Sequence, residues 1–175
     1  VLFVGKPSPG KGWPVFVAAA GAMPGIYFIH VGPPPPQSPA NVFLMGSLPR
    51  ADVLMWMRAS TLVCVPPATP DALPRVALEA LSQGRPVLAT PVGGLPEIVR
   101  EGITGWLAPA ERFAETLQRV LKDAYGLRYA TSRARAEVVA SFGLGPTTER
   151  VLEVYRMVAV RGSTAHAPGA PDTCR

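Results

Sequence analysis

Six short runs of apolar residues, without polar alternation, recur through residues 1–108 of this chain. They are Val1–Gly5, Ile26–Gly32, Asn41–Ser47, Thr61–Pro66, Pro86–Thr90 and Gly105–Ala108. Such runs are typical of strands buried on both faces, which occur in parallel sheets. Amphipathic segments with a helical period separate them, which predicts an α/β fold: a doubly wound, Rossmann-like parallel sheet with helices on both faces. In such sheets ligands bind at the C-terminal ends of the strands.

Composition narrows the classes of ligand. The chain has 175 residues and a net charge of +5, which suits an anionic ligand or an anionic membrane surface. Basic residues form no run and are not interleaved with aromatic residues, which argues against nucleic acid. The two cysteines, Cys64 and Cys174, lack metal-ligand spacing, so we expect no metal site and a reduced, cytoplasmic compartment.

The two ends of the chain differ in character. It begins directly with a buried-type strand, from which we expect a piece of a longer protein. No apolar run is long enough to span a bilayer. Beyond Val160 the sequence has no apolar period. We therefore expect one ordered domain over residues 1–160 and a disordered tail over residues 161–175.

Two lysines follow the first predicted strand. Lys6 and Lys11 lie within Gly5–Gly12, directly before a predicted helix whose free N–H groups favour phosphate. The segment nearly matches the phosphate-binding P-loop, but Gly12 stands where that motif needs a Ser or Thr hydroxyl for magnesium. Pro7 and Pro9 also remove N–H groups that such a loop requires. The alternative interpretation is a pair of solvated loop charges.

Two acids and a pair of glycines are the other candidates. Asp71 precedes the helix predicted at residues 73–83, and Glu79 lies within it, away from the apolar stripe. Asp71 could simply cap this helix, and Glu79 could be a surface residue. Gly93 and Gly94 follow the fifth strand, where they either allow backbone to approach a ligand closely or form an ordinary tight turn.

In this order, the segments resemble the C-terminal domain of glycosyltransferase family 4, whose retaining enzymes have the two-domain GT-B fold. The resemblance covers about residues 1–158. It is carried by the four segments Lys6…Lys11-Gly12, Asp71…Glu79, Gly93-Gly94-Leu95-Pro96-Glu97-Ile98-Val99 and Glu101-Gly102-Ile103-Thr104-Gly105-Trp106-Leu107. It implies a UDP-, GDP- or ADP-linked sugar as donor substrate and an acceptor-binding N-terminal domain as partner. It implies no cofactor.

The resemblance also implies roles for single residues. Lys6 and Lys11 would neutralise the leaving diphosphate without a metal, and Asp71 would lie against the transferred sugar. Glu79 would accept hydrogen bonds from the ribose hydroxyls. Backbone around Leu73, Pro74, Arg75 and Val76 would contact the phosphates, and Gly93 and Gly94 would leave room beside the pocket.

The sequence departs from the family pattern at two single positions and in the segment after the second of them. Lys6 stands where the family usually has Arg, and Asp71 where it usually has Glu; Ala72-Leu73-Pro74 replaces the usual Gly-Phe-Gly. A sugar-nucleotide epimerase or hydrolase on a similar scaffold, and a non-catalytic nucleotide-binding module, therefore stay as alternatives. We expect this fragment to bind a nucleotide sugar but to transfer nothing alone, and the full-length enzyme could associate peripherally with membranes.

Overall fold

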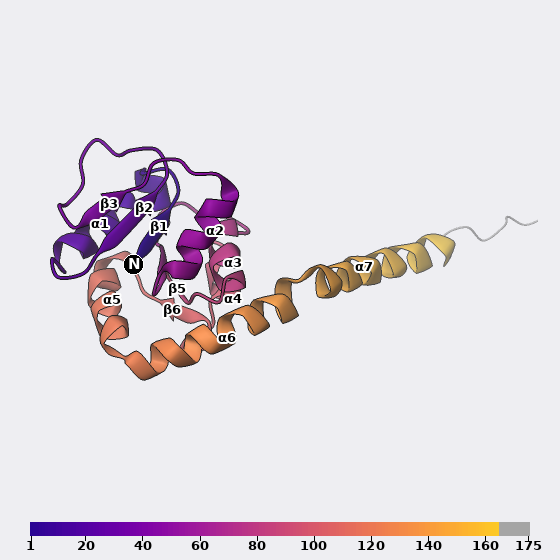
Figure 1. Cartoon of the computed structure of the whole chain (residues 1–175). Helices are drawn as coiled ribbons and strands as arrows, with labels where there is room; N and C mark the ends of the chain where they lie inside the picture. Colours follow the sequence, from indigo (N-terminus) through magenta and orange to yellow (C-terminus); the bar gives the residue numbers. More distant parts are fainter. Residues whose placement is uncertain (165–175) are drawn as a thin grey trace, which may run out of the picture. The chain divides into compact units, whose positions relative to one another are not determined.

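Six strands form a single parallel sheet in the computed structural model, which describes residues 1–164, with side chains up to residue 159 (Figure 1). The strands are β1 (Leu2–Val4), β2 (Phe28–Val31), β3 (Val42–Leu44), β4 (Val63–Val65), β5 (Val87–Ala89) and β6 (Gly105–Leu107). Each lies within one of the six apolar runs. Their order is β3-β2-β1-β4-β5-β6, so the strand order reverses between β1 and β4. The predicted Rossmann-like parallel sheet is confirmed.

Helices connect the strands and continue after the last one. They are α1 (Trp13–Gly21), α2 (Arg50–Ala59), α3 (Arg75–Ser82), α4 (Leu95–Ile98), α5 (Phe113–Lys122), α6 (Ala124–Phe142) and α7 (Leu144–Thr164). Two short 3₁₀ helices, Pro9–Lys11 and Ala110–Arg112, precede α1 and α5. The helix predicted at residues 73–83 begins two residues later, because Pro74 is its N-cap.

The sheet is buried on both faces. Phe3, Cys64 and Leu88 point to one face and form a core with α1, α5 and the start of α6. Their neighbours Leu2 and Val63 point to the other face and are fully buried, where α2 and α3 contact β1, β4 and β5. Burial on both faces explains why the strands lack polar alternation.

The described chain forms two compact units, residues 1–139 and residues from 140 onward. The expected domain boundary at 160/161 falls within α7, which continues to Thr164. Residues 165–175 of the expected tail lie outside the described residues. None of the helices within residues 1–164 combines the length and apolarity needed to cross a membrane.

Candidate functional site

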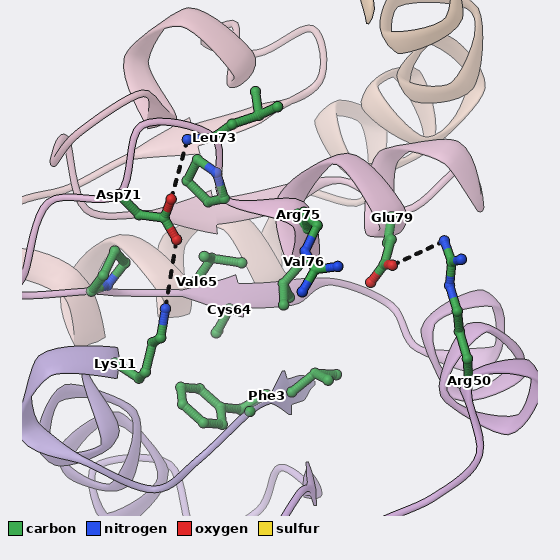
Figure 2. A pocket seen from close by; sticks show the side chains of 14 residues that line it. Phe3, Lys11, Arg50, Cys64, Val65, Asp71, Leu73, Arg75, Val76 and Glu79 are labelled. Atoms are coloured by element: carbon green, nitrogen blue, oxygen red, sulfur yellow. Dashed lines mark hydrogen bonds and ion pairs between the residues drawn. The ribbon is translucent and has the colours of Figure 1, made fainter. Parts of the chain in front are cut away.

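A pocket of about 670 Å³ lies at the C-terminal ends of β1 and β4, where the strand order reverses (Figure 2). Ligands of open α/β sheets bind at this position. The pocket combines an apolar floor with charged residues from three loops and helices. Its lining residues are Phe3, Val4, Gly5, Lys11, Arg50, Cys64, Val65, Pro67, Asp71, Leu73, Pro74, Arg75, Val76 and Glu79.

Lys11 and Asp71 occupy one end of the pocket. The Lys11 ammonium lies 3.6 Å from Oδ2 of Asp71, and both side chains are partly exposed. The other carboxylate oxygen of Asp71 accepts the backbone N–H of Leu73 at 3.2 Å. The Asp71 side chain thus bonds the backbone two residues later in the same loop. Asp71 is not the N-cap of α3, which is Pro74. Because exposed ion pairs contribute little stability, Lys11 can exchange Asp71 for an anionic ligand at small cost.

Glu79 and Arg50 occupy the opposite end (Figure 2). Glu79 faces the pocket from α3, and its Oε1 lies 3.1 Å from a guanidinium nitrogen of Arg50, the first residue of α2. Sequence reasoning missed Arg50. One feature of the sequence pointed to it. A cation in the first turn of a helix interacts unfavourably with the helix dipole, so Arg50 at the start of a predicted helix indicates a function other than helix stability.

The start of α3 lies between these two ends. Leu73, Pro74, Arg75 and Val76, to which the resemblance gave contacts with phosphate, all line the pocket. The N–H of Ala77 donates to the carbonyl of Pro74, whereas the N–H groups of Arg75 and Val76 find no acceptor within residues 1–164. These two donors and the positive end of the helix dipole make this wall attractive to anions.

Three of the predicted residues do not reach the pocket wall. The Lys6 side chain is exposed and lies outside the lining. Gly93 and Gly94 are also absent from it, because they pack against the loop that carries Asp71. A Cβ at Gly93 would overlap the Asp71 backbone, and one at Gly94 would overlap the Ala72 carbonyl. The Gly94 N–H donates to the Asp71 carbonyl at 2.9 Å, so the glycines position Asp71 rather than leave room for ligand.

Gly12 explains why the first turn only resembles a P-loop. Its φ of +80° is left-handed, and a Cβ there would overlap the carbonyl oxygen of Pro66. A Ser or Thr at this position would therefore collide with the loop after β4. The neighbouring Gly10 carbonyl accepts the N–H groups of Ala68 and Thr69, which fixes the two loops against each other.

The floor of the pocket is chemically inert. Cys64 is 1% exposed, and burial raises the pKa of its thiol to about 12. The thiol is thus neutral near pH 7 and packs as a small apolar side chain. Within residues 1–164, no three His, Cys, Asp or Glu side chains gather where they could hold a metal ion; the absence of a metal requirement stays a prediction.

Fold and pocket together define a Rossmann-like α/β domain with a charged site at the switch point of its sheet. Residues 1–123 match the family of glycosyl transferases group 1, and the chain belongs to that family. The family predicted from the sequence motifs is therefore confirmed.

Two glycosyltransferases of mycobacteria are similar to the chain. D-inositol 3-phosphate glycosyltransferase of Mycobacterium avium is 33% identical over 188 residues, covering 97% of this chain and 44% of the relative. The enzyme of that name from Mycobacterium bovis BCG is 34% identical over 176 residues, covering 89% and 36%. The chain thus spans less than half the length of these relatives.

Solved structures share the fold. Sucrose-phosphate synthase from Thermosynechococcus elongatus superimposes with a TM-score of 0.78 at 26% identity, covering 91% of this chain and 45% of that one. HepE from Anabaena, solved in complex with UDP, superimposes with a TM-score of 0.76 at 23% identity, covering 89% and 48%. The latter likeness concerns the fold alone.

Proposed function

We propose that this chain is the donor-binding, C-terminal half of a retaining glycosyltransferase and that its pocket binds a nucleoside diphosphate sugar. The observation that carries the proposal is the order of charges along the pocket: Lys11 at one end, free N–H donors of α3 in the middle and Glu79 at the other end. This order matches a molecule with a diphosphate beside a ribose. The acceptor would be held by an N-terminal domain of a longer protein. Acceptor binding can therefore be measured only with the full-length protein.

The diphosphate would lie against Lys11 and the start of α3. Glycosyl transfer builds negative charge on the leaving diphosphate while the sugar becomes cationic. An ammonium group and a helix N-terminus fixed beforehand stabilise that charge as it develops. Both belong to this chain, so the proposal requires no divalent ion.

The ribose would lie against Glu79. An ionised carboxylate is an acceptor only, which suits two neighbouring hydroxyl donors. Arg50 contacts Oε1 of Glu79, which holds the carboxylate in place and leaves Oε2 available to ligand. The pocket would thus read the nucleoside through its sugar at this end.

Asp71 would face the transferred sugar. The Lys11 ammonium and the Leu73 N–H each hold one of its carboxylate oxygens, and the Gly94 N–H holds its carbonyl. A carboxylate restrained in this way can stabilise positive charge on a sugar ring. Displacement of Lys11 toward the diphosphate would free Oδ2 of Asp71 for that contact.

Calorimetric titration of the 175-residue chain tests the proposal. We expect UDP-, GDP- or ADP-glucose to bind equally well with and without magnesium. A preference for nucleoside triphosphates with strict magnesium dependence would support a P-loop-type nucleotidase instead. Absence of binding to any of these ligands would overturn the proposal.

The reaction itself requires the full-length protein. We expect it to transfer the sugar with retention of the anomeric configuration, measured by NMR of the product, and the 175-residue chain alone to transfer nothing. Interconversion of the donor sugar without transfer would indicate an epimerase. Binding without any turnover by the full-length protein would indicate a non-catalytic module. We further propose that the enzyme acts in the cytoplasm, with peripheral contact to membranes.

Arg50 offers a prediction that separates binding from folding. Arg50→Ala should lower the free energy of unfolding by less than about 1 kcal/mol, because the Arg50 side chain is 77% exposed and the Glu79 side chain, already 24% exposed, stays in contact with solvent when the pair is lost. Nucleotide affinity should fall several-fold, because Glu79 loses the contact that orients it. Urea denaturation and calorimetry measure the two quantities. Arg58→Ala, on the exposed side of the same helix, should change neither; equal loss of affinity in both variants would refute the role of Arg50.

A further inference from the structure

The carbonyl of Gly5, at the exit of β1, is fixed by a buried histidine. Nε2 of His30 lies 2.9 Å from this oxygen. Since a carbonyl only accepts, Nε2 carries the proton. His30 is fully buried. The centroids of the Trp13 and Phe3 rings lie 4.8 and 5.7 Å from the centroid of its ring. A Cβ at Gly32 would overlap the same carbonyl, so this carbonyl is enclosed by His30 on β2 and by Gly32, the residue that follows β2.

The direction of this carbonyl determines the direction of the next N–H. The chain has no cis peptide among its described residues, and in a planar trans peptide the C=O and the following N–H point in opposite directions. The Gly5 N–H also donates to Val31 on β2, at 2.9 Å. The Lys6 N–H must therefore point away from the His30 ring and from β2.

The Gly5–Lys6 peptide begins at the edge of the pocket. β1 lies between β2 and β4, and the pocket is lined by Gly5 from β1 and by Val65 and Pro67 from the end of β4. Within residues 1–164, no acceptor takes the Lys6 N–H. The Lys6 N–H is thus a backbone donor without a protein partner, bonded directly to Gly5 at the pocket edge.

We propose that His30 is a positioning residue that turns the Gly5–Lys6 peptide so that the Lys6 N–H donates a hydrogen bond to a phosphate oxygen of the ligand. The inference rests on the proposed function and adds a donor to it. Position 6 then acts through its backbone N–H next to Gly5, and not through its exposed side chain. The phosphate would be held between this N–H, the Lys11 ammonium and the N–H groups that begin α3.

The state of the ring agrees with a fixed role. Burial lowers the pKa of His30, an effect that the Gly5 carbonyl opposes. The ring is therefore neutral near pH 7, with its one proton on Nε2. Nδ1 is buried without a partner, so Gly5 is the only polar contact that orients the ring among the described residues.

The test is an NMR titration of the ¹⁵N-labelled 175-residue chain with inorganic pyrophosphate and with UDP. We expect the Lys6 amide proton to move downfield with both ligands, as a new hydrogen bond to an anion requires. The Gly12 N–H, already bonded to the Pro9 carbonyl, serves as the internal reference and should move far less. If the ligands bind and the Lys6 amide stays in place, the inference is wrong and the proposed function stands. If neither ligand binds at up to millimolar concentration, both fail.

Two variants separate positioning from folding. His30→Leu removes the donor, and His30→Gln keeps an N–H at a similar reach. Pyrophosphate affinity should fall about tenfold in His30→Leu, the scale of one hydrogen bond to a charged group, and recover in His30→Gln. Circular dichroism confirms that each variant is folded. A folded His30→Leu protein with unchanged pyrophosphate affinity, or a His30→Gln protein as weak as His30→Leu, would overturn the proposal.

Discussion

Lys11→Ala will weaken the binding of a nucleoside diphosphate by about 1.5–3 kcal/mol, which is roughly 10- to 150-fold in Kd. Lys11 supplies the ammonium at the end of the pocket where we place the phosphates. Its only ion-pair partner within the described residues is the partly exposed Asp71. Removing Lys11 thus deletes a charge-assisted hydrogen bond with the ligand and little folding stability. Calorimetry with UDP or GDP measures the loss.

Lys122→Ala is the matched control, because Lys122 is exposed at the end of α5 and outside the pocket. It removes the same charge from the protein and should leave Kd almost unchanged. Lys6→Ala should weaken nucleotide binding less than Lys11→Ala does, since the Lys6 side chain lies outside the pocket wall. Equal losses in Lys11→Ala and Lys122→Ala would show that affinity reflects net charge, and the assignment of Lys11 would fail.

Gly12→Ala should lower the free energy of unfolding by about 2–5 kcal/mol. Two costs combine at this residue. The left-handed conformation of an Ala costs about 1–2 kcal/mol, and the added Cβ would overlap the Pro66 carbonyl, which forces the loops after β1 and β4 apart at a cost of about 1–3 kcal/mol. Urea denaturation measures the sum.

Gly102→Ala isolates the first of these costs. Gly102 has a similar φ of +69°, but nothing lies within 4 Å of the position that a Cβ would take. Gly102→Ala should therefore lower the free energy of unfolding by only about 1–2 kcal/mol. If the two variants lost the same stability, the close approach of Gly12 to Pro66 would be irrelevant, and the structural reason for the missing P-loop hydroxyl would be refuted.

The sheet could be predicted from the sequence because its cause is local. A strand buried on both faces needs apolar residues at every position, so each run reveals its own burial. That Lys11, Asp71 and Glu79 belong to one site was implied by the family resemblance; the structure brings them to one pocket, because loops after neighbouring parallel strands meet at one edge of the sheet. Arg50 was missed because it reaches Glu79 from another helix, a contact that no spacing along the chain reveals.

The glycines and the end of the last helix show two other limits. Gly93 and Gly94 pack against the loop that carries Asp71, more than 20 residues away in the sequence. The Gly-Gly pair alone therefore could not show whether the glycines make room for a ligand or for that loop. Near the C-terminus, Gly162-Ser163-Thr164 lacks an apolar period, yet α7 continues to Thr164. Helix ends are the part of a helix that sequence determines least.

In the proposed orientation of the nucleotide, the pocket binds the diphosphate at Lys11 and the ribose at Glu79. Calorimetry of the wild type, Lys11→Ala and Glu79→Gln with pyrophosphate, UDP and 2′,3′-dideoxy-UDP tests it most directly. We predict that Lys11→Ala weakens all three ligands, whereas Glu79→Gln weakens UDP but neither pyrophosphate nor the dideoxy analogue, which lacks the hydroxyls. If Glu79→Gln weakened the dideoxy analogue as much as UDP, or if Lys11→Ala left pyrophosphate binding unchanged, the proposed orientation of the nucleotide would be contradicted.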